Sequence, residues 1–155
     1  MKEAWLAVEF GNYPAAAKTV TRSLKNKKPE INEAANKLHD FVQQNLAKQI
    51  AAGTTAQAEN KPWLAYKTFA SLKTKFDGYE IKMDSDLDKT LDELKEDPTV
   101  EKEIAADKQL KSIMKKVAKS GLARAGGRLK KLAGKYPETE AGVAAQKLIA
   151  GGGQN

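Results

Sequence analysis

The chain has 155 residues, of which 41% are hydrophobic, 30% are charged and 6% are aromatic, and its formal net charge is +7. This length suits one domain with a sizeable core, and sparse aromatic residues with abundant alanine favour packed helices over sheets. The absence of cysteine excludes disulfides, thiol nucleophiles and thiolate metal sites, and leaves the compartment undefined by redox chemistry.

The N-terminal stretch does not have the pattern of a signal peptide, because Glu3 and Glu9 interrupt its apolar residues. No run of 18 apolar residues occurs, so the sequence predicts no membrane-spanning helix. Two origins stay open. The chain is cytoplasmic if it starts naturally at Met1, and periplasmic or secreted if it is a domain cut from a longer protein.

Hydrophobic residues at steps of three and four predict helices along most of the chain. The first two helices are expected at 2–10 and 14–26, separated by a Gly-Asn-Tyr-Pro turn. A longer amphipathic helix is expected at 30–52 and should end at Gly53, although residues 56–60 have the composition to resume it.

The helix expected over 61–76 is the predicted centre of the core. It holds four of the ten aromatic residues, and Trp63, Tyr66, Phe69 and Phe76 follow helical spacing. Burying each of these side chains contributes roughly 1.5–3 kcal/mol, which makes this helix the best candidate for a packing hub.

Capping residues mark the later helices. Ser85 with Asp88 is a capping-box pattern, and Asp97 with Pro98 predicts the start of the next helix. After a break at Ser120-Gly121, a continuous helix is expected over 122–136, and Thr139 is expected to cap the last one.

The predicted fold class is therefore all-α, with about eight helices in antiparallel hairpins. We expect a single domain over residues 1–150, followed by a flexible tail at 151–155.

A small residue followed four positions later by a larger apolar one recurs three times, beginning at Ala16, Ala65 and Ala125. This pattern resembles the second half of a tetratricopeptide repeat, and the ending KYPETEAGVAAQKL resembles the joint between such repeats in bacterial outer-membrane assembly lipoproteins. The residues that carry the repeat packing are Gly11, Tyr13, Ala16, Ala65, Phe69, Ala125, Leu129 and Pro137.

The resemblance implies a stack of helical hairpins whose groove binds a protein segment. We therefore expect a non-enzymatic protein-interaction or accessory scaffold module, part of a larger bacterial chain, whose partner is a protein, a peptide or an attached domain. The copies lie 49 and 60 residues apart, against about 34 in the standard repeat, and the first-helix signature is missing. A plain helical bundle is the alternative.

No cofactor, metal or catalytic residues are predicted. The aspartates at 84, 86, 88 and 92 are spaced like a calcium-binding loop, but Lys89 and Lys95 stand where that loop needs Gly and Glu. Acids at a helix start are the better explanation. His39 is the only histidine and lacks partners for a metal site or a catalytic triad.

Charge is unevenly distributed along the chain. Residues 77–107 have a net charge of −8, whereas residues 108–135 hold ten Lys or Arg and no acid. The candidate anion-binding stripe consists of Lys115, Lys116, Arg124, Arg128, Lys130 and Lys131. Such a stripe makes binding to nucleic acid or an anionic surface the second hypothesis. Nucleic acid is less favoured than a protein partner, because the stretch lacks stacking aromatics before Tyr136 and adjoins an acidic segment.

Overall fold

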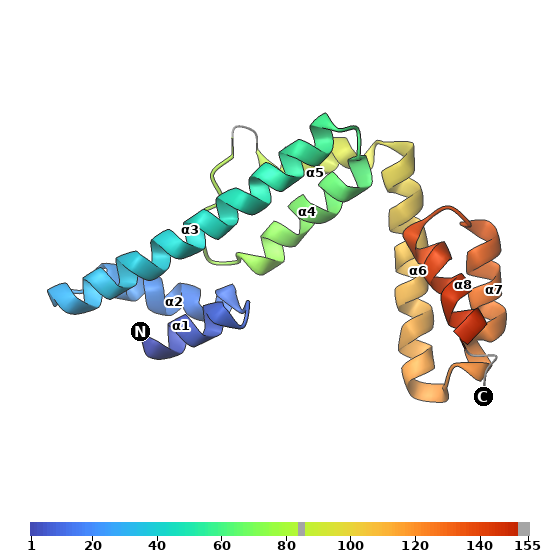
Figure 1. Ribbon diagram of the computed structural model, residues 1–155, viewed down its shortest axis with the longest axis horizontal. Coiled ribbons are helices and arrows are strands. Elements are labelled where there is room, and N and C mark those ends of the chain that lie inside the picture. Colours follow the sequence, from blue (N-terminus) through green and yellow to red (C-terminus); the bar gives the residue numbers. More distant parts are fainter. Residues whose placement is uncertain (84–85, 152–155) are drawn as a thin grey trace. The chain divides into compact units, whose positions relative to one another are not determined.

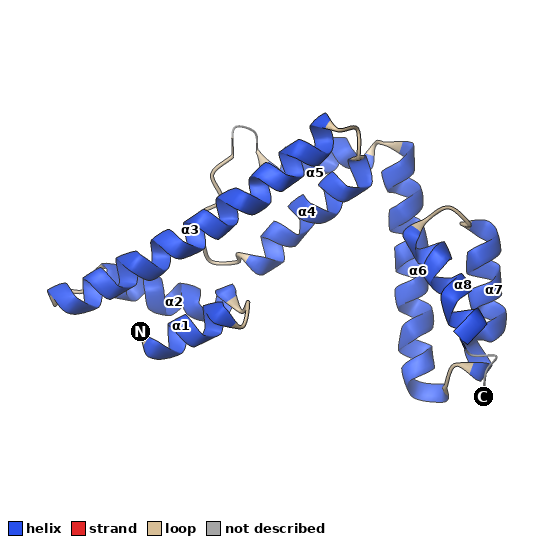
Figure 2. Cartoon of the chain, in the orientation of Figure 1, coloured by secondary structure: helices blue, strands red, loops and turns tan. Residues whose placement is uncertain are grey.

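The computed structural model describes residues 1–83 and 86–151, and all regular structure in these ranges is helical (Figures 1 and 2). The described chain contains α1 (Lys2–Glu9), α2 (Tyr13–Leu24), α3 (Pro29–Ala58), α4 (Pro62–Lys75), α5 (Leu87–Lys95), α6 (Pro98–Ser120), the short 3-10 helix η1 (Ala123–Ala125), α7 (Gly126–Lys135) and α8 (Glu140–Gly151). The predicted all-α class with about eight helices is confirmed.

The helices group into two compact units, residues 1–94 and 95–155, and the single domain expected over 1–150 stays a prediction. Each unit has its own hydrophobic cluster, and the apolar stripe of α6 packs with η1, α7 and α8. The expected tail at 151–155 falls almost entirely on residues 152–155, which lie outside the described residues; Gly151 still belongs to α8.

In unit 1, helices that are consecutive in the chain pack side by side, as α1 with α2, α2 with α3, and α3 with α4. The long helix α3 packs against both α2 and α4 (Figure 1). Helix α5 contributes Leu91 and Leu94 to the same hydrophobic cluster. This order is that of antiparallel helical hairpins.

Helix α4 supplies the centre of this core, as its sequence predicts. Ala65, Phe69 and Phe76 are fully buried. Trp63 and Tyr66 are only partly buried and stack on each other with ring centroids 5.7 Å apart. The expected hub therefore serves unit 1, and only part of its aromatic stripe reaches the interior.

The break predicted at Gly53 is wrong, because α3 continues through it to Ala58. Gly53 is buried where α3 meets α4, and a Cβ at this position would lie 2.5 Å from Cε1 of Phe69. The missing side chain makes room for the Phe69 ring. Glycine is thus needed here for close helix approach, although it lowers helix propensity.

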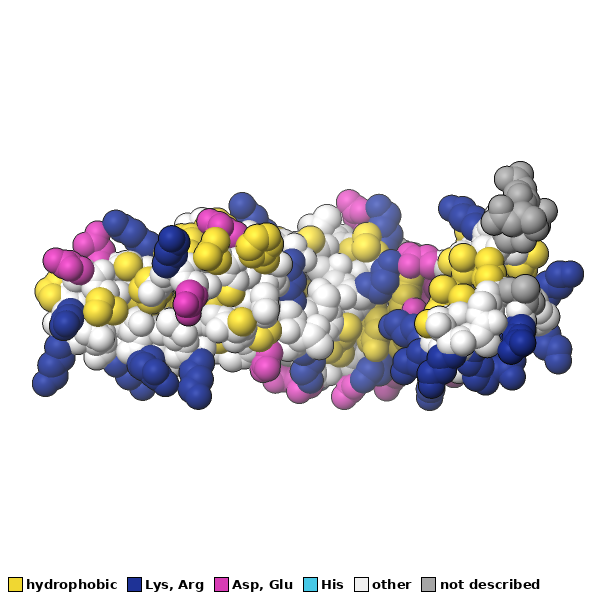
Figure 3. Space-filling view, turned by 90° about the horizontal axis from the view of Figure 1, so that it is seen from below, with side chains coloured by type: hydrophobic (Ala, Val, Ile, Leu, Met, Phe, Trp, Pro, Cys, Tyr) yellow, Lys and Arg dark blue, Asp and Glu magenta, His cyan; other side chains and the backbone are white. Residues whose placement is uncertain are grey.

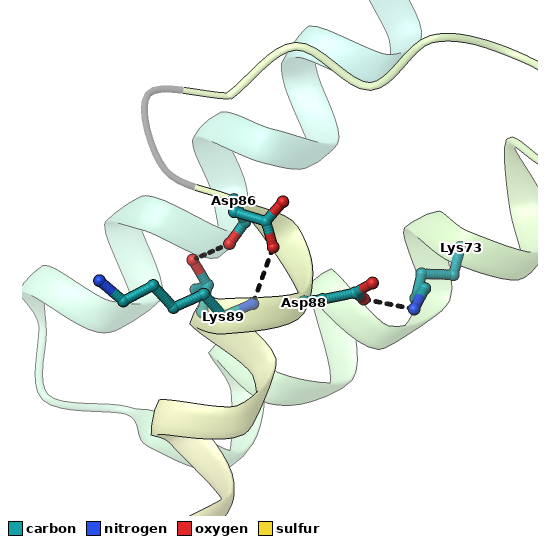
Figure 4. A network of polar contacts seen from close by, with 5 residues as sticks. Lys73, Asp86, Asp88 and Lys89 are labelled. Atoms are coloured by element: carbon teal, nitrogen blue, oxygen red, sulfur yellow. Dashed lines mark hydrogen bonds and ion pairs between the residues drawn. The ribbon is translucent and has the colours of Figure 1, made fainter.

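The first turn of α5 is held by an aspartate (Figure 4). The Asp86 carboxylate accepts a hydrogen bond from the backbone N–H of Lys89 at 3.0 Å, and Asp88 pairs with Lys73 of α4. Asp86 thus acts as the N-cap, in agreement with the prediction that these acids serve a helix start. The predicted Ser85 cap and Asp84 lie outside the described residues.

Unit 2 packs α6 against α8 and α7 around Ala106, Leu129, Leu132 and Ala145. The Asp97 carboxylate accepts hydrogen bonds from the backbone N–H groups of Thr99 and Val100, which confirms the predicted start of α6. The buried Glu103 accepts the backbone N–H of Glu140 at 3.1 Å, so a carboxylate from α6 holds the N-terminus of α8.

The predicted cap at Thr139 is confirmed. Its hydroxyl donates to the carbonyl of Tyr136 and accepts the backbone N–H of Gly142 at 3.0 Å. A Cβ on Gly142 would collide with the Tyr136 carbonyl oxygen, so this position requires glycine. The turn between α7 and α8 is therefore tightly specified.

The continuous helix predicted over 122–136 is wrong. Gly121 has a φ of +81°, which turns the chain after α6, and η1 precedes α7. Ala125 donates its backbone N–H to Leu122 in this 3-10 turn. A Cβ on Gly126 or Gly127 would meet nothing within 4 Å, so no close helix approach requires glycine at these positions.

The Gly53–Phe69 contact predicts opposite effects for two Gly→Ala substitutions. Gly53→Ala should destabilise unit 1 by about 1–3 kcal/mol, because the new methyl group collides with a buried ring. Gly134→Ala in α7 faces open space and should stabilise by up to about 0.5–1 kcal/mol. Urea denaturation monitored by circular dichroism measures both, and fluorescence of Trp5 and Trp63 reports on unit 1 alone. Equal effects at the two positions would contradict the role assigned to Gly53.

Tyr79 provides a second prediction. Its hydroxyl is buried and unpaired within the described residues, and burial together with Tyr13 raises the pKa of Tyr79 to about 12. An unfolded tyrosine releases its proton near pH 10, so stability should fall as pH rises from about 10 to 12. Tyr79→Phe should preserve the free energy of unfolding at pH 7 and reduce its loss between about pH 10 and 12. Urea denaturation at pH 7 and within this alkaline range measures both effects. Marked destabilisation of the Tyr79→Phe variant at pH 7 would show that the hydroxyl has a hydrogen-bond partner in the folded protein.

Candidate functional site

The positive charge of the protein is concentrated in unit 2. Its 61 residues carry thirteen Lys or Arg against seven Asp or Glu, a net charge of +6 out of the total of +7. Figure 3 shows Lys and Arg side chains gathered over this unit. The three acids of α6 lie in its first half together with two lysines, and its other four lysines lie in its second half, which places the excess charge near η1 and α7.

Four cations surround a pocket where α6 ends and α7 begins. This basic pocket has a volume of about 190 Å³ and is lined by Lys116, Lys119, Ser120, Arg124, Ala125 and Arg128. The turn at Gly121 reverses the chain and so brings Lys116 and Lys119 beside the two arginines. The Ser120 hydroxyl donates to the carbonyl of Lys116 at 2.9 Å, which leaves the four cations as the main donors.

A second pocket adjoins the first, because Arg128 lines both. This mixed pocket has a volume of about 250 Å³ and is lined by Gln109, Ser112, Ile113, Arg128, Lys131 and Leu132. It combines cations with the edges of two core aliphatic residues. Together the two pockets offer neighbouring sites for an anionic group and for an apolar side chain.

The structure divides the predicted anion-binding stripe. Lys116, Arg124 and Arg128 meet in the basic pocket, and Lys131 joins Arg128 in the mixed pocket. Lys115 and Lys130 are exposed and lie outside both.

Lys119 was not among the predicted stripe residues, although it lines the basic pocket. Its signal in the sequence is the i, i+3 spacing from Lys116 directly before a glycine break.

The cations of the basic pocket have no counter-charge within residues 1–83 and 86–151. Lys111 pairs with Asp107 at 2.6 Å one to two turns earlier on α6, but none of the four pocket cations forms an ion pair there. Within the described residues, the ion pair that joins the acidic segment to the basic stretch is therefore that of Lys111 with Asp107.

The one aromatic residue near the basic region is already engaged. The Lys135 ammonium lies 5.0 Å from the ring centroid of Tyr136, and the Tyr136 hydroxyl accepts a weak hydrogen bond from Gln109 at 3.4 Å. Tyr136 thus does not provide a free platform for stacking a base.

The residues of the repeat pattern lie in both units. Ala16, Ala65, Phe69 and Leu129 are fully buried, and Ala125 is nearly so. Tyr13 is buried with its ring 4.6 Å from that of Phe76. Gly11, with a φ of +74°, and Pro137 lie exposed in turns.

The described residues contain no group of three or more His, Cys, Asp or Glu side chains able to hold a metal ion. His39 is partly buried and stacks loosely on Tyr79, with centroids 6.5 Å apart. Among the described helices, none has the length and apolar character to cross a membrane.

Comparison of the chain with protein-family models, with curated proteins and with solved structures finds no match. The resemblance to tetratricopeptide repeats consequently rests on the sequence pattern and stays a prediction.

Proposed function

We propose that this chain is a non-enzymatic binding module, built from tetratricopeptide-like helical hairpins, that docks an acidic segment of a protein partner on unit 2. The observation that carries the proposal is the pair of adjoining pockets that share Arg128. One pocket offers four cations that form no ion pair with the described residues, and the other offers an apolar floor formed by Ile113 and Leu132.

An acidic peptide fits this arrangement better than a nucleic acid does. A peptide can place a carboxylate in one pocket and an aliphatic side chain in the next, whereas a phosphate backbone repeats one charge and gains nothing from the apolar floor. Single-stranded nucleic acid also gains much of its affinity from stacking on aromatic rings. Tyr136, the aromatic residue of the basic region, is already covered by Lys135.

The proposal predicts salt-dependent binding of an acidic, partly apolar peptide. A fluorescein-labelled decapeptide of Glu and Leu should bind the full chain at about 50 mM salt and more weakly at about 150 mM, because screening shortens the reach of the field. Reversing Lys115, Lys116, Lys130 and Lys131 to Glu should weaken binding on the order of tenfold or more, since each exposed pair contributes about 0.2–1 kcal/mol. Fluorescence polarisation measures the affinities, and circular dichroism verifies folding.

A matched control reverses four exposed lysines of unit 1, at positions 2, 18, 27 and 48, and should leave binding almost unchanged. Equal losses in the two variants would show attraction to net charge alone. Tighter binding to duplex DNA than to the peptide, persisting at the higher salt concentration, would favour the nucleic-acid hypothesis instead.

A further inference from the structure

We propose that the basic pocket binds a phosphate monoester, carried by a phosphorylated side chain of the partner segment. This inference rests on the proposed function, since it assigns the anionic group that enters the pocket beside Arg128. The ligand class follows from the number of cations, from their unpaired state and from their position in the fold.

Three other pockets of the described residues combine their cations with acids. Lys18, Arg22 and Lys25 line a pocket that also contains Asp77. Lys102 and Lys135 line another that contains Glu138, and Lys73 lines one that contains Asp86 and Asp88. The basic pocket gathers four cations and, among the described residues, no acid. Its charge is left for a ligand to neutralise.

Arg128 lies in the first turn of α7. The N-terminal end of a helix carries positive partial charge, so a cation there is unfavourable and an acid is favoured. The first turn of α7 contains no acid, and Ala125 at its N-cap provides no side-chain hydrogen bond. Helix stability therefore does not account for an arginine at this position, whereas an anion held between Arg124, Arg128 and the two lysines does.

A phosphate monoester matches the basic pocket in charge and in donor geometry. A phosphate monoester carries about −1.5 to −2 charges at pH 7 and three strong acceptor oxygens, whereas a carboxylate carries one charge on two oxygens. An arginine fork binds two phosphate oxygens at once, and a lysine supplies up to three donors to one point. Two arginines and two lysines around about 190 Å³ exceed what one carboxylate can pair, and suit a tetrahedral dianion.

The test uses a decapeptide of Glu, Leu and one phosphoserine next to a leucine, compared with the same peptide carrying Ser or Asp. Fluorescence polarisation with the full chain at about 150 mM salt suppresses diffuse attraction. We expect the phosphopeptide to bind at least tenfold more tightly than the Asp peptide. Comparable affinities for the three peptides would overturn the inference.

Two pairs of variants localise the effect. Lys116→Gln with Lys119→Gln should remove most of the gain from phosphorylation, whereas Lys108→Gln with Lys130→Gln, which removes the same charge outside the pocket, should change it less than twofold. Arg124→Lys with Arg128→Lys keeps the charge and removes the forks, so it should also reduce the gain several-fold. Equal losses of the phosphorylation gain in the two lysine variants would contradict the inference, because they would show attraction to the overall positive charge and not to the basic pocket.

The source of the phosphate is tested with vesicles of phosphatidylcholine containing phosphatidylinositol 4-phosphate, and with inorganic phosphate as a competitor. Inorganic phosphate at millimolar concentration should displace the phosphopeptide. The protein should bind vesicles that contain phosphatidylinositol 4-phosphate no more tightly than vesicles of phosphatidylcholine alone. Vesicle binding through Lys116 and Lys119 without phosphopeptide binding would overturn the inference in favour of a lipid headgroup. Salt-dependent binding of the unphosphorylated peptide without a gain from phosphate would refute the inference and leave the proposed function intact; binding of neither peptide would refute both.

Discussion

Small residues that allow helices and turns to touch are the constraint on which both units depend. In unit 1, Gly53 brings α3 against the ring of Phe69, and the fully buried Ala65 lies on the same buried face of α4. In unit 2, Gly142 allows the first turn of α8 to reach the carbonyl of Tyr136. Interiors are packed so densely that one added methyl group at such a point must displace a neighbour. The spacing of the helices at these contacts is therefore set by glycine residues, which have no side chain.

Hydrogen bonds at helix ends fix the elements that carry the basic pocket. Asp97 caps α6, and Thr139 with the buried Glu103 holds the start of α8 against α6. The contacts of Asp97 and Glu103 lie near the start of α6, remote in sequence from the four cations, and those of Thr139 follow the end of α7. A binding site whose residues project from helices held in this way is more rigid than one on long loops, which lowers the entropic cost of binding.

The concentration of positive charge has a cost for unit 2. A unit of 61 residues buries a modest core, dominated by alanine and leucine, and like charges around one pocket repel one another in the folded state. Part of the pattern supports the fold, because acids early in α6 and lysines late in α6 complement the helix dipole. The arginines of η1 and α7 have no such role. Binding of an anion would relieve their repulsion and stabilise the folded unit by mass action.

The sequence by itself determined the helical class, most helix boundaries and the caps at Asp97 and Thr139. These features depend on hydrophobic spacing and on short-range hydrogen bonds, both of which are local. It also identified the basic region, since charge can be counted without knowing the fold.

Only the tertiary structure decided what depends on distant contacts. From the sequence, Gly53 predicts a helix break. In the structure, the ring of Phe69, sixteen residues later, fills the space beside Gly53 within a continuous α3. The division into two units depends on which helices cover the stripe of α6. The selection of Lys116, Lys119, Arg124 and Arg128 from ten cations depends on the turn at Gly121, because a helix direction after a left-handed glycine is set by packing and not by the glycine itself.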